Sequence, residues 1–351
     1  MTDRATYVAA GVDIEAGDRA VELMKASVSR ASRSEVVGGL GGFAGLFRFD
    51  TTKYRRPLLA TSTDGVGTKV AIAQALDKHD TIGIDLVGMV VDDLVVCGAE
   101  PLFMTDYIAC GKVVPERIAA IVGGVAQGCQ QAGCALVGGE TAEHPGLLGP
   151  DEYDLAGAGT GVVEEDSVLG AHRVAAGDVV IAMASSGLHS NGYSLARHVL
   201  LARGGLRLDQ RVDELGRTLG EELLVPTRIY SLDCLALMAA IDVHAFSHVT
   251  GGGLAANLDR VLPAGVDVEI DRTTWAPAPI FELIRHVGDV TTPELERTLN
   301  MGVGMVAIVA ATDADRAVAV LADRGVPAWV AGRALTGKGT GTTTLVSTYA
   351  R

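Results

Sequence analysis

The sequence predicts an α/β protein with two domains, and three observations support this prediction. At 351 residues the chain exceeds the length at which a single hydrophobic core usually stops growing, so two cores are expected. Hydrophobic residues make up 48% of the chain but aromatic residues only 4%, so small aliphatic side chains dominate, as suits α/β packing. Glycine-containing turns also recur between a predicted strand and a predicted helix.

The first part of the chain is predicted to begin with a helix and a glycine-rich loop. Val21, Met24 and Val28 recur at helical spacing, which predicts the first helix. Glycine-rich backbone can approach a ligand closely, so the loop that follows is a candidate contact site. In chain order the predicted elements are a helix over about 13–30, a glycine-rich loop over 38–45, a strand over 57–63, a turn over 64–69 and a helix over 70–76.

A longer helix is predicted over 81–98, with aspartates on the face opposite its apolar residues. Asp85 and Asp92, seven residues apart, share that face, and exposure to solvent is sufficient to explain Asp85. Asp92 and Asp93 stand among valines and leucines, where a charge is costly unless it is solvated or paired. Coordination of a metal ion would offset that cost, so a solvated helix face and a metal site both remain open for this pair.

The remaining elements indicate where the domains divide. Strands are predicted over 135–139 and 156–163, with a polar loop between them that contains Glu140, Thr141 and Glu143. A turn-rich stretch near 166–177 precedes the next strand and predicts the boundary. The predicted domains are residues 1–170 and 171–335, followed by a flexible tail over 336–351.

Composition excludes several partner classes. The net charge of −14 repels phosphate backbones and anionic lipid surfaces, so we expect no nucleic-acid partner and no membrane partner. The five cysteines form no Cys-x-x-Cys pair, as suits a reducing cytoplasm and disfavours zinc. The N-terminal residues have neither the basic region nor the apolar run of a signal peptide, and the most apolar stretch, 82–97, carries three aspartates. We therefore expect a cytoplasmic protein.

Common nucleotide-binding motifs are absent or incomplete. Gly-x-x-x-x-Gly-Lys-Ser/Thr does not occur, so a P-loop is unsupported. Gly39-x-Gly41-x-x-Ala44 resembles a dinucleotide fingerprint but lacks the preceding strand, and a structural turn and a phosphate contact are equally supported there. Asp64 follows a predicted strand, where it could hold a magnesium ion that bridges nucleotide phosphates or simply be a solvated turn residue.

Histidines offer two further candidates. His189 lies in a turn rich in serine, glycine and asparagine over 185–192, which favours a ligand-binding turn over a core position. His244 and His248 have the spacing that would place both on one helix face, but no third ligand is adjacent, so zinc is disfavoured. Neither Gly-x-Ser-x-Gly nor His-Glu-x-x-His occurs, which removes the best support for a serine hydrolase or a zincin.

Taken in order, these segments resemble the phosphoribosylformylglycinamidine cyclo-ligase family, also called aminoimidazole ribonucleotide synthetases. The resemblance covers about residues 7–334, and its specificity comes from several independent motifs in the same order. The segments that carry it are AGVD at 10–13, the glycine loop at 38–43, TDGVGTK at 63–69, HDTIGIDLVGMVVDDLVVCGAEP at 79–101, VGGETAE at 137–143, SSGLHSNGYS at 185–194, and the stretches 226–230, 249–254 and 281–304.

The resemblance implies a two-domain synthetase fold and a reaction. The N-terminal sheet would form a dimeric barrel with ATP bound beside the homodimer interface, and the second domain would be α+β. The family uses ATP to phosphorylate the formamide oxygen of formylglycinamidine ribonucleotide, after which the amidine nitrogen attacks and phosphate leaves. The implied products are 5-aminoimidazole ribonucleotide, ADP and phosphate, in de novo purine biosynthesis.

Site residues are carried over position by position as implications of the same resemblance. Asp64 and Asp93 would bind Mg²⁺ and nucleotide phosphate, with Asp92 a further metal candidate and Asp106 a weaker one. Lys69 would neutralise phosphate charge, and His189 would donate to developing charge or shuttle a proton. The implied nucleotide contacts are Gly41, Gly42, Gly65, Thr68, Gly251, Gly252 and Gly253, and the implied substrate contacts are Ser186, Ser190, Asn191, Glu140 and Thr141.

Two departures and several alternatives accompany this assignment. Asp92 stands where relatives often have asparagine, which leaves the number of metal ions open, and the tail beyond Leu335 lies outside the resemblance. Selenophosphate synthetase, thiamine monophosphate kinase, a hydrogenase-maturation dehydratase and the preceding amidotransferase share the fold and the phosphoryl-activation chemistry. A catalytically silent nucleotide-binding protein is the alternative from another class, and loss of the carboxylates and of His189 would be its signature.

Overall fold

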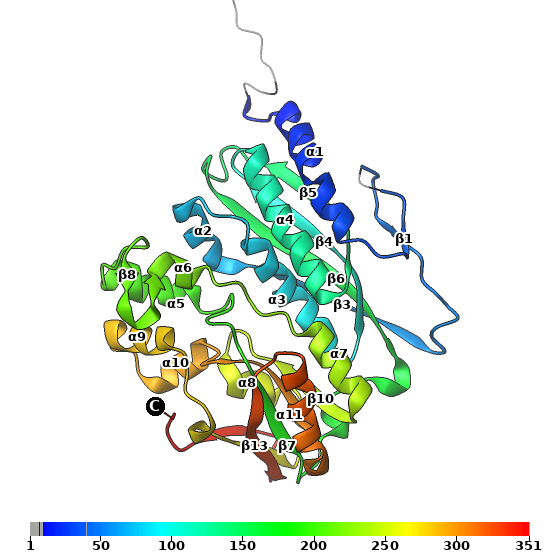
Figure 1. The fold of residues 1–351 in the computed structure, drawn as a ribbon, viewed down its shortest axis with the longest axis vertical. Helices are drawn as coiled ribbons and strands as arrows, with labels where there is room; N and C mark the ends of the chain where they lie inside the picture. The colour runs from blue at the N-terminus through cyan, green and yellow to red at the C-terminus, as the bar shows by residue number, and fades with distance from the viewer. Residues whose placement is uncertain (1–6, 8–9, 40, 351) are drawn as a thin grey trace, which may run out of the picture.

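The computed structural model describes residues 7, 10–39 and 41–350, which build two sheets with packed helices (Figure 1). The first sheet lies in the N-terminal half and has the strand order β3-β6-β4-β5. Strands β4 and β5 pair in parallel, whereas β6 pairs antiparallel with both of its neighbours. The bounds are β3 (Pro57–Gly65), β4 (Glu100–Cys110), β5 (Ala135–Glu143) and β6 (Tyr153–Glu164).

Helices cover one face of this sheet. Glycines on β6 allow the close approach, because a Cβ atom at Gly157 would meet Leu86 and one at Gly159 would meet Val90 and Leu94. The residues on the opposite face, including Ala156 and Ala158, are not covered by these helices. The layer contains α3 (Ile82–Val96) against the sheet, α4 (Pro115–Ala132) beside α3, and α1 (Ile14–Arg30) packed on α4.

The second sheet has the order β10-β12-β7-β13-β11-β14 and is antiparallel except for the pairing of β11 with β14. Both of its faces are buried: alternate residues of β7 join a cluster with Leu254 and Leu258 of α8, or a cluster with Leu237 of α7 and Leu321 of α11. The bounds are β7 (Val179–Ala184), β10 (Val243–His248), β11 (Val266–Asp271), β12 (Val303–Val309), β13 (Ala328–Thr336), β14 (Thr343–Val346), α7 (Ser231–Ala240), α8 (Gly253–Asp259) and α11 (Ala314–Asp323).

The largest hydrophobic cluster spans both halves of the chain. It unites Val66 and Ile72 from the first half with Leu188, Tyr193 and Leu223 from the second, so the two halves share a core. Remaining elements are α2 (Val70–Leu76), α5 (Tyr193–Arg197) running into a π-helical turn (His198–Arg203), α6 (Leu219–Leu223), α9 (Pro279–Gly288), α10 (Thr292–Thr298), and the short hairpins β1 (Val36–Val37) with β2 (Leu46–Phe47) and β8 (Arg211–Val212) with β9 (Arg217–Thr218).

The first helix is confirmed, and its cap explains where it begins. The carboxylate of Asp13 accepts a hydrogen bond from the backbone N–H of Ala16, which satisfies one of the free donors at the helix start. Its buried positions are Ala20, Met24 and Val28, whereas Val21 is exposed. The predicted helical spacing was therefore right for two of its three positions.

Two expectations need correction. The tail is not a free end, because β14 pairs in parallel with β11 and the ring of Tyr349 packs edge-on against Trp275. Glu140 and Thr141 lie on β5 rather than in a loop, since β5 stays in register with β4 as far as Glu143. Within the residues described, the first sheet is open along β3 and β5, and a barrel would need a second copy of the chain, so the dimeric barrel stays a prediction.

Residues 1–6, 8, 9, 40 and 351, which fall in the predicted domains, the glycine loop and the tail, lie outside the described residues. Among the helices of the described part, none combines the length and the apolarity needed to cross a bilayer.

Candidate active site

A pocket of about 300 Å³ opens where the first sheet meets the second. Its walls come from four elements that are far apart in the sequence: strand β3, helix α3, strand β10 and helix α8. Its polar lining includes Thr61 and Ser62 of β3, Asp93 of α3, Ser247 and His248 of β10, and Arg260 directly after α8. The pocket is therefore a product of the tertiary structure, and both halves of the chain contribute polar side chains to it.

Asp93 and His248 face each other across this pocket. The Nδ1 atom of His248 lies 2.9 Å from Oδ1 of Asp93, and 43% of the Asp93 side chain is exposed against 2% for His248. Burial lowers the pKa of His248, but the hydrogen bond to Asp93 and the charges of Asp92, Asp93 and Asp64 outweigh burial and raise it overall. The Nε2 atom of His248 is buried without a hydrogen-bond partner in the described part of the chain.

Asp64 lies close to the same pair. It precedes the final residue of β3 and shares its register position with Gly157, on the helix-covered face of the sheet. Burial and the charge of Asp93 raise the pKa of Asp64, while the N–H of Gly65 and the charge of His248 act in the opposite direction. Because the charge of Asp93 disfavours the charged form of Asp64, a cation bound between the two carboxylates would stabilise that form.

The donor set fits magnesium bound together with phosphate. Among the described residues, no group of three His, Cys, Asp or Glu side chains could by itself enclose a metal ion. Mg²⁺ is commonly held by one or two carboxylates, with substrate phosphates and water completing its octahedron. Asp64 and Asp93 match that requirement.

Asp92 is not oriented towards this pocket. Its side chain is fully buried, and the backbone N–H of Tyr230 donates to both carboxylate oxygens at 3.0 and 3.1 Å. Burial raises the pKa of Asp92 to about 7, and the charge of His248 opposes this rise. The geometry does not support the predicted metal contact, because both oxygens of Asp92 are directed at the chain segment that precedes α7.

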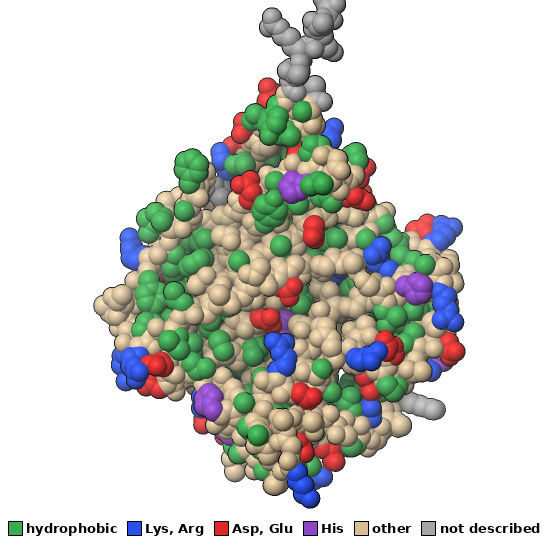
Figure 2. Space-filling view, turned by 180° about the vertical axis from the view of Figure 1, so that it is seen from behind, with side chains coloured by type: hydrophobic (Ala, Val, Ile, Leu, Met, Phe, Trp, Pro, Cys, Tyr) green, Lys and Arg blue, Asp and Glu red, His purple; other side chains and the backbone are tan. Residues whose placement is uncertain are grey.

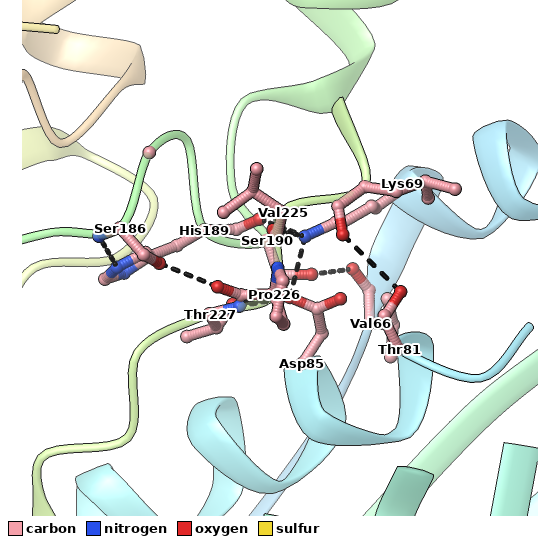
Figure 3. A network of polar contacts seen from close by, with 12 residues as sticks. Val66, Lys69, Thr81, Asp85, Ser186, His189, Ser190, Val225, Pro226 and Thr227 are labelled. Atoms are coloured by element: carbon pink, nitrogen blue, oxygen red, sulfur yellow. Dashed lines mark hydrogen bonds and ion pairs between the residues drawn. The ribbon is translucent and has the colours of Figure 1, made fainter. Parts of the chain in front are cut away.

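Lys69 and Asp85 are buried as an ion pair, as Figure 3 shows. The solvated-face interpretation of Asp85 is therefore wrong: its carboxylate lies 2.8 Å from the Lys69 ammonium, and neither side chain is exposed to solvent. The ammonium also donates to the carbonyls of His189 and Val225. With its three N–H bonds directed at these partners, Lys69 is not placed to neutralise a phosphate group in the pocket.

The turn at 185–192 adopts an unusual backbone. His189 has a φ of 61°, in the left-handed region, and its Nε2 accepts a hydrogen bond from the N–H of Ser186. Burial lowers the pKa of His189 well below its ordinary value, so the imidazole is neutral. Its Nδ1 has no partner among the described residues. The predicted residues of this turn are thus brought together, but His189 lies beneath its surface.

Asn191 connects this turn to the second glycine segment. Its Oδ1 accepts from the N–H of Gly251, and Gly252 and Gly253 follow with φ values of 99° and 76°. Asn257 supports the segment from below, because its side-chain amide donates to the carbonyls of Thr250, Gly251 and Gly253. The Oδ1 of Asn257 also lies 3.3 Å from a guanidinium nitrogen of Arg260.

Other predicted residues are distributed around the site. Ser190 donates to the carbonyl of Val66 and Ser186 to that of Pro226, which ties the turn to both halves of the chain (Figure 3). Thr68 is exposed, with its hydroxyl 3.2 Å from that of Ser194, and Gly65 lies at the end of β3. None of these four predicted residues is among those that line the pocket.

The structure separates the remaining candidates from the pocket. Glu140 shares its register position with Tyr107 and Ala156, on the sheet face opposite Asp64, and neither Glu140 nor Thr141 is among the residues that line the pocket. Asp106 is buried under the helices, and burial raises its pKa to about 7. Gly41 and Gly42 lie in the loop between β1 and β2, well apart from α8 and β10 in Figure 1.

Sequence reasoning missed His248 and Arg260 as parts of this site. The sequence pattern suggests His248 only as a zinc ligand together with His244, but both histidines lie on strand β10, where four residues span about 13 Å. His244 instead contacts Asp178. The signal in the sequence that could have identified both residues is their position, because His248 precedes and Arg260 follows the Thr250–Gly253 turn.

Comparison with known proteins gives the family. The family model for the N-terminal domain of AIR synthase related proteins matches residues 44–163, and the model for the C-terminal domain matches residues 175–344. A phosphoribosylformylglycinamidine cyclo-ligase of Brevibacillus brevis is 52% identical over 332 residues, which cover 95% of this chain and 96% of the relative. One from Anaeromyxobacter sp. strain Fw109-5 is 53% identical over 342 residues, 97% of this chain and 99% of the relative.

Solved structures show the same fold at low identity. Thiamine-monophosphate kinase from Stenotrophomonas maltophilia superposes with a TM-score of 0.66 at 20% identity, covering 95% of this chain and 97% of that one. The hydrogenase maturation protein HypE, solved in complex with ATP, gives a TM-score of 0.64 at 18% identity, covering 95% and 93%. Because the much higher identity extends over nearly the whole chain, this protein belongs to the phosphoribosylformylglycinamidine cyclo-ligase family.

Proposed function

We propose that this protein uses ATP to close the imidazole ring of 5-aminoimidazole ribonucleotide from formylglycinamidine ribonucleotide, as a step of de novo purine biosynthesis. The observation that carries the proposal is identity above 50% over nearly the full length of relatives named for this reaction. The pocket between the sheets supplies the polar groups that a phosphoryl transfer requires. The ATP-bound HypE structure, which shares the fold, supports ATP as the nucleotide.

The chemistry proceeds in two steps. The formamide oxygen attacks the γ-phosphorus of ATP, ADP leaves, and the oxygen becomes part of an iminophosphate. The amidine nitrogen of the same molecule then attacks the activated carbon, the carbon–oxygen bond breaks, and phosphate leaves with that oxygen. Because the nucleophile is intramolecular, the protein chiefly has to fold the substrate and stabilise charge on the transferring group.

Asp64 and Asp93 are the residues that would hold Mg²⁺, which neutralises charge on the phosphoryl oxygens when it is bound. His248 orients the Asp93 carboxylate through its Nδ1 hydrogen bond. Arg260, held next to the pocket by Asn257, supplies a planar donor group suited to phosphoryl oxygens. In the glycine segment 251–253, the N–H of Gly251 donates to Asn191 and that of Gly253 to the carbonyl of Thr250, so the N–H of Gly252 is the candidate local donor for an anion despite the overall charge of −14.

The turn at 185–192 would contact the ribonucleotide. Ser186, Ser190 and Asn191 are fixed there by hydrogen bonds to Pro226, Val66 and Gly251. The neutral His189 beneath them keeps this backbone in its left-handed conformation through the contact with the Ser186 N–H. We assign His189 to the support of the turn, and the proton shuttle suggested by resemblance would need the buried Nδ1 to become accessible.

A homodimer is part of the proposal. The uncovered face of the first sheet carries Leu59 and Tyr107, which are 69% and 42% exposed, beside the small residues Ala156 and Ala158. Figure 2 shows the molecule from behind. The surface over this region consists largely of hydrophobic side chains (green) and of uncharged side chains and backbone (tan), with few charged side chains. Packing of two such faces would bury this apolar surface and bring the Gly41–Gly42 loop towards a second copy. Sedimentation equilibrium of the protein and of Leu59→Glu tests this, because the substitution should shift the species towards monomer.

The activity itself is tested by coupling two measurements. Purified protein is incubated with Mg-ATP, with and without formylglycinamidine ribonucleotide, while ADP and aminoimidazole ribonucleotide are measured in parallel. We expect ADP release that depends on the substrate and equals imidazole formation one for one. Nucleotide binding with no imidazole product under any condition would contradict the proposal and direct attention to thiamine and carbamoyl substrates.

A further inference from the structure

The buried network of Figure 3 joins three chain segments at one nitrogen atom. The Lys69 ammonium lies 2.8 Å from Oδ1 of Asp85, 2.9 Å from the carbonyl of His189 and 2.6 Å from the carbonyl of Val225. An ammonium has three N–H bonds, and here each has a partner. One side chain therefore sets the relative position of helix α3, the 185–192 turn and the segment before residue 226.

Asp85 extends the network to a fourth point. The same Oδ1 atom accepts hydrogen bonds from the backbone N–H of Thr227 at 2.8 Å and from its hydroxyl at 2.7 Å. Oδ2 of Asp85 is buried without a partner among the described residues. The carboxylate thus holds Thr227 on α3 while it compensates the charge of Lys69.

The buried ion pair of Lys69 and Asp85 is not expected by itself to increase the stability of the folded protein. Burial lowers the pKa of Lys69 and raises that of Asp85, so desolvation opposes the charged form of both groups. Buried ion pairs often add no net stability relative to apolar side chains of similar size. The network does, however, supply donors for two buried carbonyls that otherwise have to be satisfied.

The turn that Lys69 contacts needs external support. His189 occupies the left-handed backbone region, which is unfavourable for a residue other than glycine and persists where surrounding contacts impose it. The Lys69 ammonium binds the carbonyl of this same residue, and Ser190 next to it donates to the carbonyl of Val66. Both contacts lead back to residues that follow Asp64 closely in the sequence.

We propose that Lys69 and Asp85 are positioning residues that hold the 185–192 turn in register with the end of strand β3. They act through the turn and make no contact with the reactants. Their task is to fix the separation between Asp64 on one side of the site and Ser186, Ser190 and Asn191 on the other. The inference rests on the proposed function for the meaning of that separation, but the geometry that it predicts can be measured without any turnover.

Two single variants and their combination separate positioning from stability. Lys69→Met removes the ammonium, and Asp85→Asn removes the negative charge while its Oδ1 can still accept from Thr227. The double variant removes both charges. Arg272→Met is the matched control, because Arg272 likewise binds one carboxylate, that of Glu296, and two carbonyls, those of Leu345 and Ser347.

Three readouts are taken for each variant: the melting temperature, hydrogen exchange of the amides of residues 186–191, and kcat and KM for both substrates. We expect the double variant to regain thermal stability lost in Lys69→Met, because no unpaired buried carboxylate remains. Its turn amides should nevertheless exchange faster, since the carbonyls of His189 and Val225 have lost their donor. Its kcat/KM should fall about 100-fold, as expected for a small displacement of groups in an active site.

The control variant Arg272→Met distinguishes a general loss of stability from a loss of turn positioning. Arg272→Met should lower the melting temperature but leave the exchange of residues 186–191 and the value of kcat unchanged. A double variant whose melting temperature, turn exchange and kcat/KM all match wild type would overturn the inference. If Lys69→Met does not fold, the double variant decides alone. If the wild-type protein forms no imidazole product, the proposed function fails, and the exchange data still decide the positioning role.

Discussion

The hydrogen bond between Nδ1 of His248 and Oδ1 of Asp93, 2.9 Å long, connects the two halves of the chain across the candidate active site. Asp93 lies on α3 beside the first sheet, and His248 is the last residue of β10 in the second sheet. The contact fixes the direction of a carboxylate that remains accessible from the pocket. It also means that any change in the packing of the two sheets would move a residue expected to bind the metal.

Replacing Asp93 by asparagine should depress turnover about 100- to 1000-fold, because a carboxylate that stabilises charge on the transferring group is lost. The fold should be retained, since the amide keeps the shape and still can face His248. Steady-state ADP and product formation, with circular dichroism of the same sample, check this. Asp289→Asn is the control, because Asp289 is an exposed helix cap with a φ of 50°, which asparagine tolerates. Wild-type turnover in purified Asp93→Asn would remove that residue from the mechanism.

Asp64→Asn should separate stability from ligand binding. The pKa of Asp64 is raised in the folded protein by burial and by Asp93, so its charged form opposes folding above the unfolded pKa of about 4. The neutral amide should therefore leave the melting temperature at pH 7 equal to or above that of wild type. At the same time, the rise in melting temperature that Mg-ATP causes should shrink, because ligand stabilisation follows affinity. An undiminished rise with Mg-ATP would show that Asp64 does not contribute to nucleotide binding.

Asp92→Asn should change how stability depends on pH. The folded pKa of Asp92 is about 7 against an unfolded value of about 4, so the folded state binds the proton more tightly between these values. This group therefore costs wild-type stability progressively as pH rises from about 4 to about 7. Asparagine can still accept from the Tyr230 N–H, and it does not titrate. The free energy of unfolding is measured with urea, without magnesium, at several pH values. As pH rises, the free energy of unfolding of the variant should increase relative to that of wild type. A difference that stays constant with pH would contradict the raised pKa of Asp92.

Arg260→Gln should raise the KM for one of the two phosphorylated substrates about 10- to 100-fold, the value of one or two lost charge-assisted hydrogen bonds. Arg260→Lys should recover part of the loss, because lysine keeps the charge but not the planar pair of donors. Separate titrations of ATP and of the ribonucleotide identify which phosphate is contacted. The exposed Arg285, which pairs with Glu282 on α9, provides the control substitution to glutamine. Equal KM values for both substrates in Arg260→Gln and wild type would exclude a phosphate contact.

Local elements of the N-terminal half could be predicted from the sequence because their signals are local. Asp13 as a cap and the spacing of Met24 and Val28 define the first helix. The strand over 57–63 and the helix over 81–98 likewise appear as β3 and α3, with ends shifted by a residue or two. The same reasoning failed for residues 343–346, whose polar threonines form a strand only because β11 offers an unpaired edge.

The candidate site shows the limit of the sequence more sharply. Ordered motifs indicate Asp64, Asp93, the 185–192 turn and the 250–253 turn. In the structure Asp93 lines the pocket and the charge of Asp64 interacts with that of Asp93, while hydrogen bonds join the 185–192 turn to Val66 and to Gly251. The motifs could not tell which aspartate of a helix faces the pocket, because Asp85, Asp92 and Asp93 differ by rotation about an axis whose surroundings are non-local. Only the packed structure buries Asp85 against Lys69, turns Asp92 towards Tyr230 and leaves Asp93 accessible.

The sequence by itself determined the family, several local elements of the N-terminal half and the residue types available for phosphoryl chemistry, since each of these depends on short ordered segments. The tertiary structure decided which of those residues are accessible to a ligand and which form contacts within the protein. The physical reason is burial: a charged side chain acts on a ligand where it stays accessible, and where packing removes it from water it must find a partner within the protein. A phosphate contact is expected from the sequence for both Lys69 and Asp93. In the structure Lys69 is buried and bonded within the protein, whereas Asp93 stays accessible.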